Sequence, residues 1–330
     1  MDGNGSADST EEGEHPMNPA YIKRLRTHAA DKTKFQTLED YLAFALRYLE
    51  YISDTARFQA EIVSQNEPHY HFLQYKEAGI YNVTRPLNSR LLLSFAGFER
   101  AASKFVRLLT AAREHKPTVA ERELINKTIY TAQQAIGATL DALPAGGSNT
   151  ARKVNGDLFE RLIRLIIIRL GVNCTAGTVQ LPIVIEGQTQ FSMSYQHDLI
   201  IKSGELVKAI GSVKTSSKDR LDKIFIDKFL FNRLSGKDIP HVAIFLNDVQ
   251  RKGILPKFGV SATFLPGHFK GYTVKLNPLD GVYYCDIRPN MLTEEILRDH
   301  IRTFDHFVFD DLWELLNRDA IVATIEPQEP

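Results

Sequence analysis

The segment QHDLIIKSGELVKAIGSVK, residues 196–214, contains two apolar runs separated by a short polar turn at residues 202–204. Two β-type runs joined by a few residues that include glycine predict a β-hairpin. Side chains alternate along a strand, so Ser212 and Lys214 share one face, and pairing around the turn can bring Asp198 onto the same face. A carboxylate and an ammonium group at the end of a sheet can hold a divalent cation and orient a water molecule. The competing interpretation is a solvated cross-strand ion pair.

The residues that follow the hairpin favour a site over an ion pair. Residues 214–220, KTSSKDR, lead into a helix predicted over 218–234, with Ser217 as its N-cap. Asp219 and Arg220 then lie in the first helical turn, from which side chains can enter a major groove. Aspartate accepts a hydrogen bond from cytosine N4, and arginine binds guanine O6 and N7 with two bonds. The pair therefore predicts contact with G·C base pairs.

A further carboxylate on this helix is a candidate metal ligand. Arg220 and Asp227 are seven residues apart, so they share one helix face at a separation of about 10 Å. Asp227 can thus approach the metal while Arg220 approaches the bases. Asp222 is the alternative if the helix has a different phase.

Glu160 is the second candidate carboxylate outside the hairpin. It lies on a strongly apolar helix predicted over 157–170, which Gly171 ends. Asp157, Glu160, Arg161 and Arg164 form one narrow polar stripe on this helix. The stripe is either an exposed face with a Glu160–Arg164 pair or part of a site, and the hairpin downstream favours the site.

This arrangement resembles a known family. Asp198 together with Ser212-Val-Lys214 is similar to the PD-(D/E)XK motif, in the variant found in type II restriction endonucleases that cut sites with a CCGG core, the group of NgoMIV, AgeI and BsaWI. In that variant a Ser stands two residues before the lysine, and the following helix supplies the missing acid. Three positions depart from the pattern. His197 replaces proline, Asp227 replaces the usual Glu, and Lys218 replaces the first Arg of the base-reading element with the spacing one residue shorter.

The resemblance implies a fold, an activity and a set of site residues. The fold is α/β, a restriction-endonuclease-like core with a mixed central sheet between helices. The activity is Mg²⁺-dependent cleavage of double-stranded DNA at a palindromic CCGG-containing site, leaving 5′-phosphates, with Mn²⁺ as a substitute for Mg²⁺. Asp198, Asp227 and Glu160 are the implied metal ligands and Lys214 the catalytic lysine. Lys218, Asp219 and Arg220 are the implied DNA contacts. Asn149, Lys153 and Asn155 remain open candidates for a minor-groove contact.

Partners follow from the same resemblance. A palindromic site read identically on both strands calls for a homodimer on DNA, with a higher oligomer left open. A restriction enzyme also implies a DNA methyltransferase in the same system and a prokaryotic cytoplasm. The rival functions are a superfamily nuclease of DNA repair or recombination and a non-catalytic DNA-binding protein on this fold.

The charge balance and the cysteine count limit the classes of protein that these motifs can belong to. Forty Lys and Arg residues balance 40 Asp and Glu residues, so any nucleic-acid surface must be a local patch. Residues 205–237 form such a patch, with eight basic and four acidic residues. Two cysteines exclude a disulfide scaffold and a cysteine-rich zinc module. No secretory signal or membrane span is visible, which predicts a soluble protein of a reducing compartment.

The chain divides into three predicted regions. Residues 1–19 have the composition of a disordered tail. Residues 20–147 show helical periodicity with no strand-like alternation, so they predict an all-helical N-terminal domain, a layout most similar to BsaWI. Capping boxes at Thr37 and Thr118 begin two of its helices. The Pro- and Gly-containing stretch 144–150 is the predicted linker, and residues 148–330 form the nuclease domain.

Overall fold

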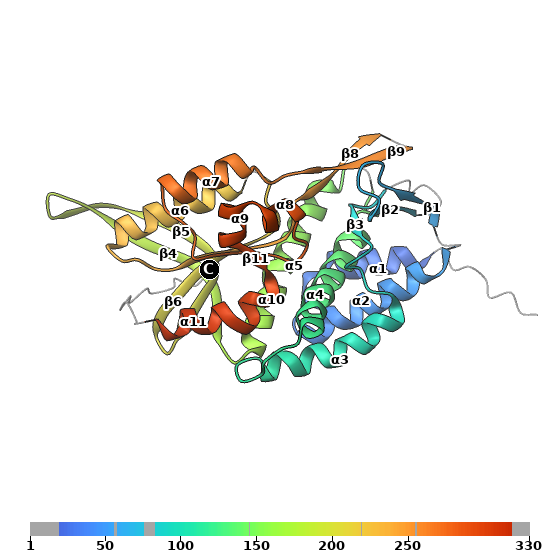
Figure 1. Cartoon of the computed structure of the whole chain (residues 1–330), viewed down its shortest axis with the longest axis horizontal. Helices are drawn as coiled ribbons and strands as arrows, with labels where there is room; N and C mark the ends of the chain where they lie inside the picture. Colours follow the sequence, from blue (N-terminus) through green and yellow to red (C-terminus); the bar gives the residue numbers. More distant parts are fainter. Residues whose placement is uncertain are drawn as a thin grey trace, which may run out of the picture.

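A six-stranded mixed sheet organises the C-terminal half of the chain (Figure 1). The computed structural model describes residues 20–55, 58–75, 83–144, 146–218, 220–254 and 256–318. The strand order is β11-β10-β7-β6-β5-β4. The strands are β4 (Asn173–Ile185), β5 (Gln188–Ser203), β6 (Leu206–Ser216), β7 (His241–Asn247), β10 (Gly281–Tyr284) and β11 (Ile301–Thr303). The pairs β4–β5 and β5–β6 are antiparallel, whereas β6, β7, β10 and β11 are parallel.

The predicted hairpin of residues 196–214 is confirmed as β5 and β6. Ser203 pairs with Leu206, and Gly204 has a φ of +59° in the turn between them. Glycine adopts this left-handed conformation without a Cβ clash. The hairpin continues backwards into β4, which pairs with β5 to form an arm projecting from the sheet (Figure 1).

Helices cover both faces of this sheet, as its apolar pattern requires. Along β7, Val242 and Ile244 pack in the cluster that contains helix α5 (Ser148–Arg169), whereas Ala243 and Phe245 pack in the cluster that contains α6 (Leu221–Ser235). All seven residues of β7 are buried. A parallel strand buried on both faces is typical of a sheet between two helical layers.

Four helices dominate the N-terminal half: α1 (Ala20–Ala30), α2 (Leu38–Ser53), α3 (Phe95–Ala111) and α4 (Val119–Leu140), with a 3₁₀ turn η1 (Lys32–Lys34). Both predicted capping boxes form: Thr37 caps α2 together with Asp40, and Thr118 caps α4 together with Glu121. These helices confirm most of the helical prediction.

The prediction that residues 20–147 are all-helical is wrong. They also contain an antiparallel sheet of β1 (Phe58–Val63), β2 (Tyr70–Tyr75) and β3 (Leu87–Asn88). Five of the six β2 residues are buried. A strand buried on both faces has no polar and apolar alternation, so periodicity alone does not reveal it.

One hydrophobic cluster crosses the predicted boundary at residue 147. Residues of α2 and α4 share this cluster with Leu158 and Ile163 of α5 and with Val213 of β6. Helix α5 already begins at Ser148, so the second half of the predicted linker is helical. The division at residue 147 stays a prediction, and residues 1–19 lie outside the described part of the chain.

The C-terminal segments differ from the sequence prediction in two places. Residues 272–286 are rich in β-type residues and predict a strand, but α7 (Pro266–Lys275) occupies the start of this segment. Pro266 lies in the first turn of α7, where its missing N–H costs nothing. The helical periodicity of residues 293–316 predicts one or two closing helices, but β11 interrupts the helices of this region. They consist of α8 (Pro289–Thr293), α9 (Glu295–His300), α10 (Phe304–His306), η3 (Phe307–Asp311) and α11 (Leu312–Asn317). Among the described helices, none has the length and apolar character needed to cross a membrane.

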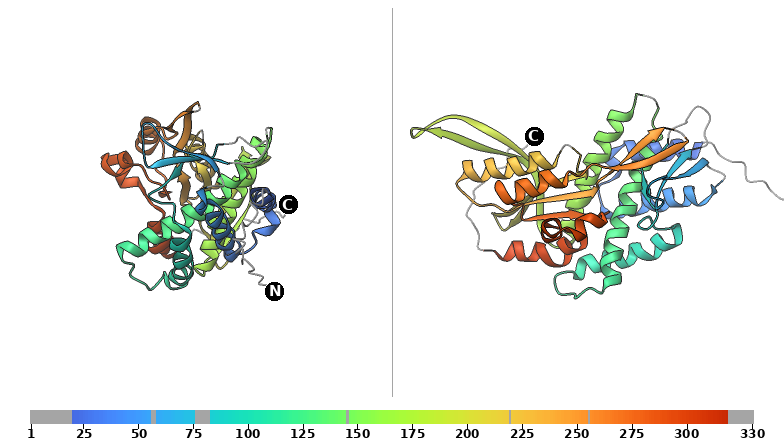
Figure 2. Two further views of the ribbon diagram at one scale, coloured as in Figure 1. Left: turned by 90° about the vertical axis from the view of Figure 1, so that its right-hand side faces the viewer. Right: turned by 45° about the horizontal axis from the view of Figure 1, so that its top comes forward.

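Two further strands, β8 (Val249–Ile254) and β9 (Lys257–Ala262), form a separate antiparallel ribbon. The ribbon extends from the central sheet to the β1-β2-β3 sheet, as two views show (Figures 1 and 2). The β-type residues over 260–265 predict a single strand here, and the sequence pattern does not predict its pairing with β8.

Candidate functional site

Asp198, Lys214 and Glu160 converge at one place in the fold. The Lys214 ammonium Nζ lies 2.5 Å from Asp198 Oδ2 and 2.8 Å from Glu160 Oε1. Asp198 belongs to β5, Lys214 to β6 and Glu160 to α5, so three elements each supply one side chain. The three side chains are between 12 % and 30 % exposed, so the cluster is partly buried and still accessible from solvent.

A β-bulge positions Asp198. Thr175 of β4 pairs with Ile200, and Gly177 pairs with His197. Asp198 and Leu199 therefore lie opposite the single residue Ala176. An extra residue on one strand bends that strand and redirects its side chains. As a result, His197 packs against Phe231 of α6, while Asp198 bonds to Lys214.

The Asp198 carboxylate is held in place by the neighbouring strand as well. Its Oδ2 accepts a hydrogen bond of 2.8 Å from the backbone N–H of Val213. Arg164 of α5 donates to the Asp198 carbonyl oxygen at 3.2 Å. The backbone and the side chain of Asp198 are thus both fixed, which preorganises the carboxylate next to Lys214.

The polar side chains of α5 bond to neighbouring elements and do not form a separate solvent-exposed face. Glu160 bonds to Lys214, and Arg164 bonds to β5, so the alternative Glu160–Arg164 pair does not form. Asp157 pairs with Lys32 at 2.7 Å, and Arg161 donates to the Lys32 and Phe35 carbonyl oxygens. The stripe therefore joins α5 to the N-terminal half on one side and to the cluster on the other.

The electrostatics of the cluster suit binding of a cation. Burial raises the pKa of Glu160, and the negative charge of Asp198 raises it further. Burial lowers the pKa of Lys214, but the attraction of Asp198 and Glu160 outweighs it, and the net shift is upward. Lys214 therefore stays an ammonium group at neutral pH. A positive charge placed near both carboxylates would relieve the repulsion between them.

Asp198 and Glu160 are the residues that fit a divalent cation. Two carboxylates offer hard oxygen ligands, and Mg²⁺ is commonly bound by one or two carboxylates with water and substrate phosphate as its other ligands. No group of three His, Cys, Asp or Glu side chains in the described ranges is placed to hold a metal ion. A cation bound by Asp198 and Glu160 would therefore need water or phosphate as its further ligands.

Asp227 pairs with Lys223 on its own helix, with a distance of 2.5 Å between Nζ and Oδ2. Its charge acts on His197 and Tyr195, whose side chains pack against α6. The structure does not bring Asp227 together with Asp198 and Glu160. Its role as a metal ligand stays a prediction.

Of the predicted DNA-reading residues, Lys218 and Arg220 lie in a turn before α6. Lys218 and Arg220 are exposed, and Asp219 lies outside the described residues. The N-cap of α6 is Arg220, which makes no side-chain cap, so the prediction of Ser217 as the N-cap is wrong. Ser217 Oγ lies instead 3.1 Å from Thr263 Oγ1, because the residues after β9 pack against this turn.

The turn between β6 and α6, residues 216–220, has a neighbour that the sequence pattern does not predict. This neighbour is Gln250 of β8. Its Oε1 accepts a hydrogen bond of 3.1 Å from Lys218 Nζ. The two residues are 32 positions apart, so no local pattern connects them. Of the three minor-groove candidates, Asn155 is buried and bonded to Gln133, whereas Asn149 and Lys153 are exposed.

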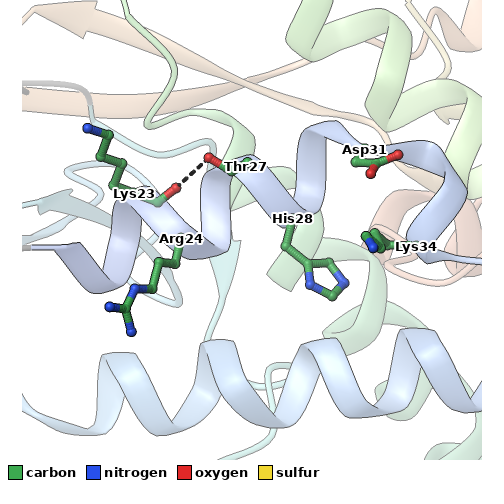
Figure 3. A pocket seen from close by; sticks show the side chains of 6 residues that line it. All are labelled: Lys23, Arg24, Thr27, His28, Asp31 and Lys34. Carbon is green, nitrogen blue, oxygen red and sulfur yellow. Dashed lines mark hydrogen bonds between the residues drawn. The ribbon is translucent and has the colours of Figure 1, made fainter.

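A pocket of about 510 Å³ lies far from these residues in the sequence, on α1 and η1 (Figure 3). It is lined by Lys23, Arg24, Thr27, His28, Asp31 and Lys34. None of the predicted site residues lines it. The candidate site is therefore the carboxylate–lysine cluster and not this pocket.

Comparisons with known proteins bear on the fold. No protein-family model matches the chain, and no curated protein matches it. The crystal structure of the type IIP restriction endonuclease Kpn2I is similar, with a TM-score of 0.68 at 17 % sequence identity, over 91 % of this chain and 99 % of Kpn2I. A complex of the restriction endonuclease PspGI with substrate DNA gives a TM-score of 0.41 at 16 % identity, over 67 % and 91 % of the two chains. The chain therefore has the fold of the restriction endonuclease Kpn2I, and the predicted core of a mixed sheet between helices is confirmed.

Proposed function

We propose that the protein is a type II restriction endonuclease that cuts double-stranded DNA at a palindromic site with a CCGG core and leaves 5′-phosphates. One observation carries the proposal: Asp198 of the bulged strand β5, Lys214 of β6 and Glu160 of α5 converge, and the exposed Lys218 and Arg220 follow β6. The restriction-endonuclease fold supports it.

The site residues divide the chemistry between them. Asp198 and Glu160 would hold Mg²⁺, with Mn²⁺ as a substitute, and Asp227 is the further proposed ligand. A bound divalent ion supplies charge neutralisation at the phosphate and makes a water molecule more acidic. The Lys214 ammonium orients the attacking water and stabilises the negative charge that develops on the phosphate in the transition state. Because Lys214 stays protonated, it does not act as the general base.

The 216–220 turn supplies sequence recognition in this proposal. Arg220 donates two hydrogen bonds to a guanine, Asp219 accepts one from a cytosine, and Lys218 contacts a neighbouring guanine or phosphate. Two copies related by a two-fold axis read both halves of a palindrome, so the active form is a homodimer on DNA. A methyltransferase that protects the same site in a prokaryotic cytoplasm completes the system.

Digestion of a sequenced, unmethylated plasmid in Mg²⁺ tests the proposal. The wild-type protein is compared with Asp198→Ala and with Glu99→Gln, which changes an exposed carboxylate of α3. Discrete cuts at CCGG-containing sites by the wild type and Glu99→Gln, absent from Asp198→Ala, are the expected result. Cuts that depend on Asp198 without sequence preference would indicate a repair or recombination nuclease. DNA binding without any cutting, and without an Asp198-dependent Mg²⁺ or Mn²⁺ site, would indicate a non-catalytic protein.

A further inference from the structure

The β8–β9 ribbon carries positive charge and no negative charge. Residues 249–262 contain Arg251, Lys252 and Lys257 and neither Asp nor Glu. Arg251, Lys252, Ile254 and Lys257 are exposed. A two-stranded ribbon of this kind fits the major groove of B-DNA, which is about 12 Å wide.

One face of the ribbon, here called the inner face, is fixed to the N-terminal half. Val249, Phe258 and Val260 form a hydrophobic cluster with Tyr70 and Phe72 of β2. This cluster spans nearly 200 residues of sequence, so the ribbon is held by tertiary packing. The inner face is therefore not available to a partner.

Polar contacts reinforce the same attachment. Asn66, in the β1–β2 loop, donates to the Val260 carbonyl oxygen at 2.8 Å and accepts from the Val260 N–H at 2.9 Å. Arg251 donates to the Val83 carbonyl oxygen at 2.7 Å, and its guanidinium lies over the Phe258 ring. The N-terminal half thus acts as a rigid support for the ribbon.

The opposite face, here called the outer face, adjoins the 216–220 turn. Strand alternation places Gln250, Lys252 and Ile254 on this face, opposite Val249 and Arg251. The bond between Gln250 and Lys218 shows which way the face points, because Lys218 belongs to the turn. The outer face and the turn therefore form one continuous cationic surface.

We propose that the outer face of the ribbon is a second DNA-contact surface, in which Gln250 contacts a base pair flanking the core site and Lys252 and Lys257 contact phosphates. The proposal rests on the function proposed above and extends it to the bases outside the core. A glutamine carboxamide can both accept and donate, which matches adenine N6 and N7. Lysine side chains suit phosphates, since they act as point charges.

Binding measurements test the phosphate contacts. Affinity for a CCGG-containing duplex is measured against salt concentration without divalent cations, for the wild type, Lys252→Ala/Lys257→Ala and Lys116→Ala. Lys116 is an exposed lysine between α3 and α4 and outside the ribbon, so Lys116→Ala controls for the loss of one surface charge elsewhere. Loss of two phosphate contacts should reduce the slope of log K against log salt by about 2, since each contributes about 0.9. A double variant with the slope of the wild type and of Lys116→Ala would overturn this part.

Cleavage of a duplex library with random bases beside CCGG tests the base contact. Gln250→Ala should still cut the core but lose about tenfold or more of the preference among flanking bases. Gln250→Glu keeps an acceptor for Lys218 and loses the amide donor, so it should lose the same preference. If Gln250→Glu retained the preference, Gln250 would only position Lys218, and the base contact would be refuted. A wild type that neither binds nor cuts this DNA would refute the proposed function itself, whereas a wild type that cuts with no flanking preference would refute the Gln250 contact alone.

Discussion

At the scale of single residues, the cluster depends on the charge of Lys214. Its ammonium group bonds to both the Asp198 and the Glu160 carboxylates, which repel each other. The upward shift of the Lys214 pKa shows that this attraction outweighs the effect of burial. A lysine suits this position because its compact charge on a flexible chain can lie between the two carboxylates.

Replacement of Lys214 by alanine should abolish most of the cleavage and preserve DNA binding. Loss of a group that stabilises transition-state charge costs about 100- to 1000-fold in rate. Single-turnover cleavage and duplex affinity should be measured together, in Mg²⁺ and without it respectively. Lys208→Ala is the matched control, because Lys208 lies on the same strand and bonds to the Arg318 carbonyl oxygen, remote from the cluster. Wild-type rates in Lys214→Ala would show that the ammonium group takes no part in the reaction.

At the scale of elements, the packing of β6 between β5 and β7 fixes the spacing of the site. Gly211 lies three residues before Lys214 in the middle of this sheet. A Cβ at Gly211 would lie 2.8 Å from Val242 Cγ2 and 3.2 Å from Leu199 Cδ1. Leu199 adjoins Asp198 in the bulge, so a displacement at Gly211 would reach the Asp198 carboxylate through one covalent neighbour.

Gly211→Ala should therefore lower the free energy of unfolding by about 1–3 kcal/mol, the usual cost of overpacking a core. Denaturant unfolding with linear extrapolation measures the difference. Gly271→Ala provides the control, because this α7 position has open space around the added Cβ. That variant should be stabilised by about 0.5–1 kcal/mol, since alanine favours a helix over glycine. Equal stability of Gly211→Ala and the wild type would mean that the sheet adjusts without cost.

The sequence was sufficient for the hairpin and for both capping boxes, but not for the N-cap of α6, because Ser217 contacts the distant Thr263. The hairpin, its glycine turn and both capping boxes depend on residues within a few positions of each other, and all of them formed as predicted. The bulge at Asp198 could not be predicted, because it depends on register against β4. The strand β2 and the Lys218–Gln250 bond were missed for the same reason: burial and pairing with distant residues decide them.

At the scale of the whole molecule, the N-terminal half is coupled to the sheet edge beside the site. The parallel strands β7 and β10 end at Asn247 and Tyr284, and Asp248 and Asp286 follow them. Asp286 accepts hydrogen bonds from Tyr70 Oη at 2.9 Å and from Asn88 Nδ2 at 2.8 Å. The first contact comes from β2 and the second from β3. The sheet that supports the ribbon is thereby tied to the edge at which β6 presents Lys214.

A partly buried salt bridge extends this connection. Arg288 Nη2 lies 2.8 Å from Oε1 of Glu67, a residue of the loop between β1 and β2. Arg288 Nε lies 3.9 Å from Oδ1 of Asp248. Asp248 is 2 % exposed, and its Oδ1 has no hydrogen-bond partner in the described residues. Burial raises the pKa of Asp248 to about 7 and that of Asp286 to about 6. We therefore expect the connection between the two halves to depend on pH.

The raised pKa of Asp248 fixes the sign of that dependence. In the unfolded chain the carboxyl has a pKa of about 3.8, so between pH 4 and pH 7 the folded state holds more protons than the unfolded state. Stability from this group is therefore complete below about pH 4 and is lost as the pH rises to about 7. Asp248→Asn removes the ionisation, so its melting temperature should exceed that of the wild type at pH 8, with a gap that narrows steadily toward pH 4. Thermal unfolding at several pH values, with the exposed Asp299→Asn as control, measures this gap. A gap that is constant over the range would mean that Asp248 is ionised in the folded protein already at pH 4, and that Arg288 compensates its burial in full.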